Sequence, residues 1–254
     1  MRVGRGRYAL PEQNPAREAA AAAGGVLSHL SAAVELGLAV LCPPDAIHVT
    51  VPRAAHRRPP PGVVLHRSDL LPQDRNRRST TVWRTVLDCA DTLRLAEALA
   101  VADSALREGL VGPTDLAAAA QEWRRPGAAR VRRVVANADG SAANPFESAL
   151  RAVLLDAGIA EFVPQQPVPL VTGATVRVDL GDRRRRIALE ADSFEYHGTR
   201  RALRDDCRRY DELARAGWTV LRFAWEHVVG DPRWVASVVT DVCASVDRQL
   251  DRAS

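Results

Sequence analysis

Lysine is missing from this sequence: all 35 basic residues of the 254-residue chain are arginines. Any mechanism that requires a catalytic lysine, as a base or as a Schiff-base nucleophile, is therefore excluded. Cysteine is scarce, with four residues far apart in the chain and no C-x-x-C pair. That spacing argues against a zinc site and against a disulfide scaffold, so we expect reduced, ordinary cysteines.

Long apolar runs are also lacking. The longest candidate, residues 19–27, is mostly alanine and glycine and falls short of the roughly 20 residues that a membrane span requires. The start, MRVGRGRYAL, has no apolar core like that of a signal peptide. We therefore predict a cytoplasmic protein without a membrane partner.

The composition is that of a globular protein, with 46% apolar and 26% charged residues. The length suits one large domain or two small ones, and we favour two. Residues 1–144 carry 19 arginines against 14 acidic residues, whereas residues 145–254 carry 16 against 17. A basic first half beside a slightly acidic second half suits a polyanion-binding module joined to a metal-binding one.

Apolar periodicity and turn residues predict the secondary structure. In the first half we expect a strand at 3–10, a helix capped by Asn14, a helix at 28–36, strands at 47–52 and 63–67, and helices between 81 and 139. After a small-residue linker at 140–143, we expect a helix at 144–156, strands at 162–165 and 168–171, a hairpin at 176–180 and 187–192, a helix at 200–216, a strand at 218–223 and a helix at 232–252.

This order predicts two domains of an α/β protein. Residues 1–140 form a mostly helical α+β accessory domain, and residues 141–254 form a mixed sheet flanked by helices. The hairpin carries Asp179 on one strand and Glu190 and Asp192 on the other. Side chains two apart on a strand share a face, so these three carboxylates crowd together. A bound divalent cation is the simplest remedy for their repulsion.

Several motifs occur together in a characteristic order: NPFESALRAVLLDAG, VPQQPV, VRVDL, IALEADSFEYH and DDCRRYDELARAGWTVLRFAWEHV. This order resembles the restriction-endonuclease-like superfamily, and within it the domain of unknown function related to the very-short-patch-repair endonuclease. The resemblance covers about residues 144–242. It implies that Asp179, Glu190 and Glu147 hold Mg²⁺, or alternatively Mn²⁺, which activates water to cut a DNA phosphodiester bond.

One departure concerns Asp192, which stands where the wider superfamily has lysine. The acid-x-Asp form resembles the very-short-patch relatives, which have a histidine shortly downstream, and this resemblance implies that Asp192 and His197 are catalytic and take over proton handling. Imidazole chemistry near neutral pH suits His197 for orienting or deprotonating the water. The same resemblance gives Gln165, Arg208 and Arg209 as substrate-binding candidates. Glu147 has a second interpretation, as an acid that stabilises the N-terminus of its helix, and the two roles can coexist.

The segments RGRYALP and LSHLSAAVELGL more faintly resemble abortive-infection antitoxin-type transcriptional regulators. In those relatives a helix-turn-helix lies upstream, so we expect the recognition helix to be missing here, by truncation or by loss. The leading hypothesis is a Mg²⁺-dependent DNA endonuclease. The alternative is a non-catalytic nucleic-acid-binding or antitoxin-like regulator that retains a nuclease fold. RNA cleavage and a homodimer formed through the first half both stay open.

Overall fold

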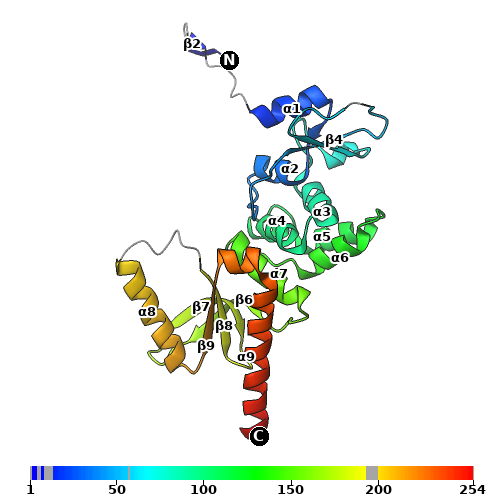
Figure 1. The fold of residues 1–254 in the computed structure, drawn as a ribbon. Coiled ribbons are helices and arrows are strands. Elements are labelled where there is room, and N and C mark those ends of the chain that lie inside the picture. Colours follow the sequence, from blue (N-terminus) through cyan, green and yellow to red (C-terminus); the bar gives the residue numbers. More distant parts are fainter. Residues whose placement is uncertain (1, 5–6, 9–13, 57, 193–199, 254) are drawn as a thin grey trace.

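The computed structural model describes residues 2–4, 7–8, 14–56, 58–192 and 200–253. Together they form a mixed α/β structure, in agreement with the predicted class (Figure 1). The predicted strand at 3–10 is wrong in detail: β1 (Arg2–Gly4) and β2 (Arg7–Tyr8) are two short strands that pair antiparallel.

A three-stranded sheet follows, in the order β3 (Val26–Leu27), β4 (Ile47–Val51), β5 (Val63–Arg67). β3 and β4 are antiparallel, and β4 and β5 are parallel. Helix α1 (Pro15–Ala23) begins where predicted, because the Oδ1 atom of Asn14 accepts hydrogen bonds from two free N–H groups of its first turn. Helix α2 (His29–Glu35) also confirms the prediction.

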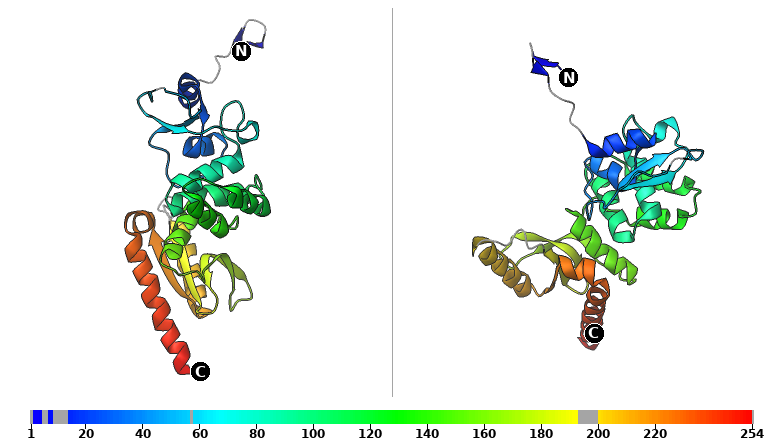
Figure 2. Two further views of the ribbon diagram at one scale, coloured as in Figure 1. Left: turned by 90° about the vertical axis from the view of Figure 1, so that its right-hand side faces the viewer. Right: turned by 45° about the horizontal axis from the view of Figure 1, so that its top comes forward.

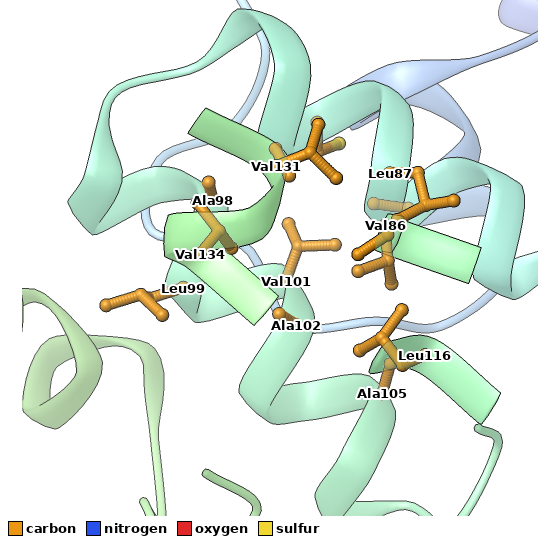
Figure 3. Close-up of a cluster of buried hydrophobic side chains, with 14 of the residues drawn as sticks. Val86, Leu87, Ala98, Leu99, Val101, Ala102, Ala105, Leu116, Val131 and Val134 are labelled. Carbon is orange, nitrogen blue, oxygen red and sulfur yellow. The ribbon is translucent and has the colours of Figure 1, made fainter. Parts of the chain in front are cut away.

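Four helices make the next layer, as the apolar spacing predicted: α3 (Val82–Thr92), α4 (Leu95–Arg107), α5 (Pro113–Glu122) and α6 (Ala128–Asn137). Their buried sides share one apolar core, in which side chains from all four helices meet (Figure 3). A single 3₁₀ turn, η1 (Pro72–Asp74), precedes them.

The second half contains a four-stranded sheet in the order β6 (Val163–Pro169), β7 (Thr175–Asp182), β8 (Ile187–Asp192), β9 (Thr219–Ala224). Strand β7 is antiparallel to both of its neighbours, β6 and β8, whereas β8 and β9 are parallel. The two strands expected at 162–165 and 168–171 are a single strand, β6, so that prediction was wrong. The hairpin of β7 and β8 is confirmed.

Helices cover both faces of this sheet. One face packs against α8 (Arg200–Arg215), and the other packs against α7 (Pro145–Asp156) and α9 (Pro232–Ala253). Figure 1 shows α8 and α9 on opposite sides of the strands. A π-helical turn, η3 (Glu226–Gly230), connects β9 to α9. The last turns of α9 extend past the sheet in all three views (Figure 2).

The segment predicted as a flexible linker, 140–143, packs against α4. Ala142 is buried, and its carbonyl oxygen accepts a hydrogen bond of 2.8 Å from the Nη1 atom of Arg107. One turn before Arg107 on α4, Asp103 forms a buried ion pair of 2.7 Å with Arg151 of α7 and accepts a hydrogen bond from Ser148. The boundary at residue 140 stays a prediction, but α4 and α7 are joined by a specific polar network.

The sequence led us to expect cysteines without disulfide bonds and a chain without a membrane-spanning helix. The four cysteines, Cys42, Cys89, Cys207 and Cys243, are free. Within the described parts of the chain, none of the helices combines the length and the apolar character that crossing a membrane requires.

Candidate active site

The hairpin of β7 and β8 brings two predicted acids together. Its pairs Leu180↔Leu189 and Gly181↔Ala188 set a register that places Asp179 opposite Glu190, one step further along. The Oδ2 atom of Asp179 accepts a hydrogen bond of 2.8 Å from the backbone N–H of Ala191. Asp179 is therefore anchored to the neighbouring strand beside Glu190.

Strand β7 is irregular at Asp179. Val178 packs on the α8 side of the sheet, whereas Leu180 packs on the α7 side. Residues two apart on a regular strand share a face, so the alternation breaks between them. The neighbouring strand is irregular at the same level: Gln165 lies opposite Asp179 and has a φ of 50°, in the left-handed region. Such irregularities re-aim side chains, and they cluster at functional sites.

Glu190 and Asp192 lie on the same face of β8, as their two-residue spacing predicted, and each contacts an arginine there. The Nη2 atom of Arg209 on α8 donates to the Oε1 atom of Glu190 at 2.7 Å. Arg222 of β9 donates to the Oδ2 atom of Asp192, and its guanidinium lies 4.2 Å from the ring centre of Tyr210. Both acids therefore have an arginine partner.

Glu147 lies in the first turn of α7, which Asn144 caps. Its Oε1 atom accepts a hydrogen bond of 2.8 Å from the Asn144 side chain, and its Oε2 atom accepts one of 2.9 Å from the backbone N–H of Ala143. The Nε2 atom of Gln165 donates to the same Oε2 atom at 2.8 Å. Glu147 thus holds the residues that precede α7, whereas the free N–H groups of the helix are capped by Asn144, and Glu147 also contacts the candidate Gln165.

Burial and mutual repulsion shift the pKa values of three carboxyl groups. Burial, followed by the charge of Asp179, raises the pKa of Glu147 to about 7. The same two causes, opposed by Arg209, raise the pKa of Glu190 to about 7. Burial raises the pKa of Asp179 as well, although the hydrogen bond from the backbone N–H of Ala191 lowers it in part. The groups on α7, β7 and β8 thus form one electrostatically linked carboxylate cluster, defined here as Glu147, Asp179 and Glu190.

The donor chemistry of the carboxylate cluster fits magnesium, which prefers a few hard carboxylate oxygens together with water. Its raised pKa values fit as well, because a bound cation would relieve the repulsion that raises them. The carboxylate oxygens of Glu147, Asp179 and Glu190 do not all lie within 4.8 Å of one another. Among the described residues, the group that meets this distance is a cluster of three histidines in the first half of the chain. Side-chain rotation is therefore needed before these three residues share one ion.

The remaining predicted site residues lie in different places. Gln165 and Arg209 belong to the site through their contacts with Glu147 and Glu190. Arg208 is an exposed residue of α8. His197 lies outside the described residues, so its role stays a prediction.

Sequence reasoning missed two residues, Tyr210 and Arg222, that surround Asp192. Arg222 could have been found from the parallel alignment of β8 and β9, in which it pairs with Glu190. Tyr210 follows Arg209 directly on α8, and nothing in the local sequence marks it as a partner of an acid on β8.

The fold and the site define an α/β protein with a helix-flanked mixed sheet and a cluster of three carboxylates, of which Glu147 and Glu190 are buried and Asp179 is half-buried. The chain is 31% identical over 211 residues to two proteins of Mycobacterium tuberculosis, "Uncharacterized protein Rv2248" and "Uncharacterized protein MT2308". The match covers 82% of this chain and 75% of each relative, so the chain belongs to the family of these mycobacterial proteins. Neither a protein-family model nor a solved structure matches it.

Proposed function

We propose that the chain is a Mg²⁺-dependent endonuclease that hydrolyses DNA phosphodiester bonds, with a restriction-endonuclease-like unit in residues 141–254. The observation that carries the proposal is the carboxylate cluster, in which two glutamates with pKa values of about 7 surround Asp179. Burial raises the pKa of both glutamates and repulsion from Asp179 adds to the shift, and a bound cation would relieve that repulsion.

Asp179, Glu190 and Glu147 would hold the magnesium ion. When bound, the ion would lower the pKa of a water molecule and offset negative charge on the phosphate. The protein's own groups prepare the site: Gln165 fixes one oxygen of Glu147, and the N–H of Ala191 fixes one oxygen of Asp179. Arg209 bridges Glu190 and the carbonyl oxygen of Arg177, which keeps a positive charge beside the cluster.

Proton handling is assigned to His197, because the sequence offers no lysine for that task. Asp192 then has a positioning role. It is tied to Arg222 and to the hydroxyl of Tyr210, and these contacts connect the end of β8 to β9 and α8. Arg208, exposed on the same helix as Arg209, is the candidate for a phosphate contact outside the cluster.

One observation favours a second function, a non-catalytic DNA-binding or antitoxin-like regulator. Glu147 already accepts three hydrogen bonds, and Glu190 already has Arg209 as an ion-pair partner. The acids are thus satisfied by the protein itself, as a retained scaffold without a reaction would require. The surplus of arginines in residues 1–144 supplies charge for binding a polyanion in either case.

A cleavage assay separates the two functions. Purified full-length protein is incubated with supercoiled plasmid in Mg²⁺, in Mn²⁺ or in EDTA, with a single-stranded RNA of mixed sequence as a parallel substrate. We expect metal-dependent nicking of the plasmid, reduced at least about 100-fold in Asp179→Asn and Glu190→Gln, because each loses a charged ligand. The matched control is Asp156→Asn, at the exposed C-terminal end of α7, which should retain full activity.

Cleavage that survives in Asp179→Asn would overturn the assignment of the site. A wild-type protein that binds DNA in a salt-sensitive manner without cutting it, and whose binding is unchanged in Glu190→Gln, would support the regulator instead. A rate reduced by His197→Ala at neutral pH, with DNA binding retained, is expected if His197 handles the proton.

A further inference from the structure

Three histidines converge in the first half of the chain, from three different elements. His29 is the first residue of α2, His48 lies on β4 and His66 lies on β5. One potential ligand nitrogen from each lies within 4.8 Å of those of the other two. The Nδ1 atom of His48 is 2.9 Å from the Nε2 atom of His66, and the ring of His29 stacks on that of His66 at 3.6 Å.

The local fold explains this convergence. Strands β4 and β5 are parallel, with Thr50 opposite His66, so His48 and His66 lie diagonally on one face of the sheet. The backbone N–H of Ser28 donates to the carbonyl oxygen of His48, which fixes the start of α2 against β4. His29 has a φ of 51°, an unfavourable conformation for a residue with a side chain, and it carries the ring toward the other two.

The surroundings keep the cluster uncharged. Burial lowers the pKa of all three histidines, in the case of His66 to about 4, so the rings are neutral at physiological pH. Neutral imidazole is the form that binds metal ions. Arg84, which lies close to His29, is itself paired with two buried acids, Asp74 and Asp88. Its positive charge is therefore compensated beside the cluster.

We propose that His29, His48 and His66 bind one divalent transition-metal ion of the Zn²⁺ class. Imidazole nitrogens suit Zn²⁺, Co²⁺ and Ni²⁺ rather than Mg²⁺, and three histidines leave a coordination position open. Nitrogens bound to one tetrahedral ion at the usual Zn–N distance lie about 3.4 Å apart, a spacing that modest side-chain shifts can reach here. The Oγ atom of Ser28, 2.9 Å from the Nδ1 atom of His29, orients the ring as an outer-shell partner does.

The ion would tie α2, β4 and β5 together. Each element supplies one ligand, so binding belongs to the folded state and raises the stability of the first half by mass action. The site differs from the carboxylate cluster in position and in donor type, and its occupation does not depend on nuclease activity.

The test uses the full-length protein after treatment with EDTA and dialysis. Co²⁺ is added while visible absorption is recorded, and Zn²⁺ affinity is then measured by displacement of Co²⁺. We expect one ion per chain, with the absorption of a nitrogen-ligated site and without a thiolate charge-transfer band. His48→Gln and His66→Gln should each weaken binding about 100-fold or more, because each removes a ligand. His56→Gln is the matched control, since His56 is an exposed histidine of the same half.

Thermal unfolding supplies a second readout. Zn²⁺ should raise the melting temperature of the wild type and of His56→Gln, and it should not raise that of His66→Gln. If a variant fails to fold, the stoichiometry and the Co²⁺ spectrum of the wild type decide. A folded wild type that binds no stoichiometric ion, a thiolate band, or equal affinity in the His48→Gln/His66→Gln double variant would each overturn the proposal.

Discussion

Replacing Glu190 by glutamine should make the stability of the protein less dependent on pH. The side chain of Glu190 is 6% exposed, lies beside Asp179 and accepts a hydrogen bond from Arg209. Glutamine has the shape of the protonated acid: its oxygen can accept from Arg209, and its NH₂ group can donate to Asp179. Glu190→Gln therefore fixes this position in the state that the folded protein prefers.

The magnitude follows from the pKa of Glu190, which burial and then Asp179 raise from 4.5 to about 7. At a pH between 4.5 and 7, Glu190 binds a proton in the folded protein that it does not bind in the unfolded chain. The stabilisation is fully present below pH 4.5 and is lost as the pH rises through 7. A shift of this size corresponds to at most about 3.5 kcal/mol of unfolding free energy, at about 1.4 kcal/mol per pKa unit.

The assay is urea unfolding in EDTA between pH 5 and pH 8.5. We expect wild-type stability to fall with rising pH more steeply than that of Glu190→Gln, by about 2–3 kcal/mol across the range. Glu147 and Asp88, whose pKa values burial also raises, titrate in the same window in both proteins, so the difference reports Glu190 together with Asp179, the carboxyl group beside it. Asp156→Asn, which changes an exposed acid, should follow the wild type. Parallel profiles for the wild type and Glu190→Gln would refute the reasoning.

Three further outcomes are expected. Mg²⁺ should raise the melting temperature of the wild type more at pH 8 than at pH 5.5, because protons compete with the ion for the carboxylate cluster; an equal rise in Glu190→Gln would contradict this. Arg84→Met should lower the unfolding free energy in urea by about 3–5 kcal/mol, since it removes the cation that the buried acids Asp74 and Asp88 share and leaves Asp88 with the longer contact of 3.7 Å to Arg125. Gly25→Ala should lower the unfolding free energy in the same assay by about 1–3 kcal/mol, because the added Cβ would lie 2.4 Å from a backbone oxygen of β4. Gly230→Ala, whose added Cβ would meet open space, should stay within about 0.5 kcal/mol of the wild type.

Local signals in the sequence predicted most elements, because the forces that begin and end them are local. Asn144 followed by a proline predicted the start of α7, and the cap hydrogen bonds form as expected. The alternation in 176–180 and 187–192 predicted the hairpin of β7 and β8, and with it the approach of Asp179 to Glu190.

Strand β6 shows where local signals mislead. Three prolines, Pro164, Pro167 and Pro169, interrupt its sequence and favoured two short strands. Proline cannot donate a ladder hydrogen bond, but it is tolerated at the edge of a sheet. β6 is such an edge strand, since β7 is its one neighbour in the four-stranded sheet. The position of a strand within its sheet is a tertiary property, and no local pattern contains it.

The histidine cluster was beyond the sequence for a related reason. His29, His48 and His66 are 18 or 19 residues apart, and no short spacing of the kind that marks metal-binding helices or zinc ribbons connects them. Their proximity arises from the parallel pairing of β4 with β5 and from the left-handed backbone at His29. The absence of paired cysteines argued against zinc from the sequence, but that argument does not extend to ligands gathered by tertiary structure.

Protons compete with the metal ion at both proposed sites, but they do so in different pH ranges. At pH 6 the glutamates of the carboxylate cluster, with pKa values of about 7, are largely protonated and disfavour Mg²⁺. At the same pH His66, with a pKa of about 4, is neutral, and its lone pair remains available to a transition metal. Lowering the pH from 8 to 6 is therefore expected to weaken metal binding more at the carboxylates than at the imidazoles. Each site can therefore be occupied, and each proposal can fail, independently of the other.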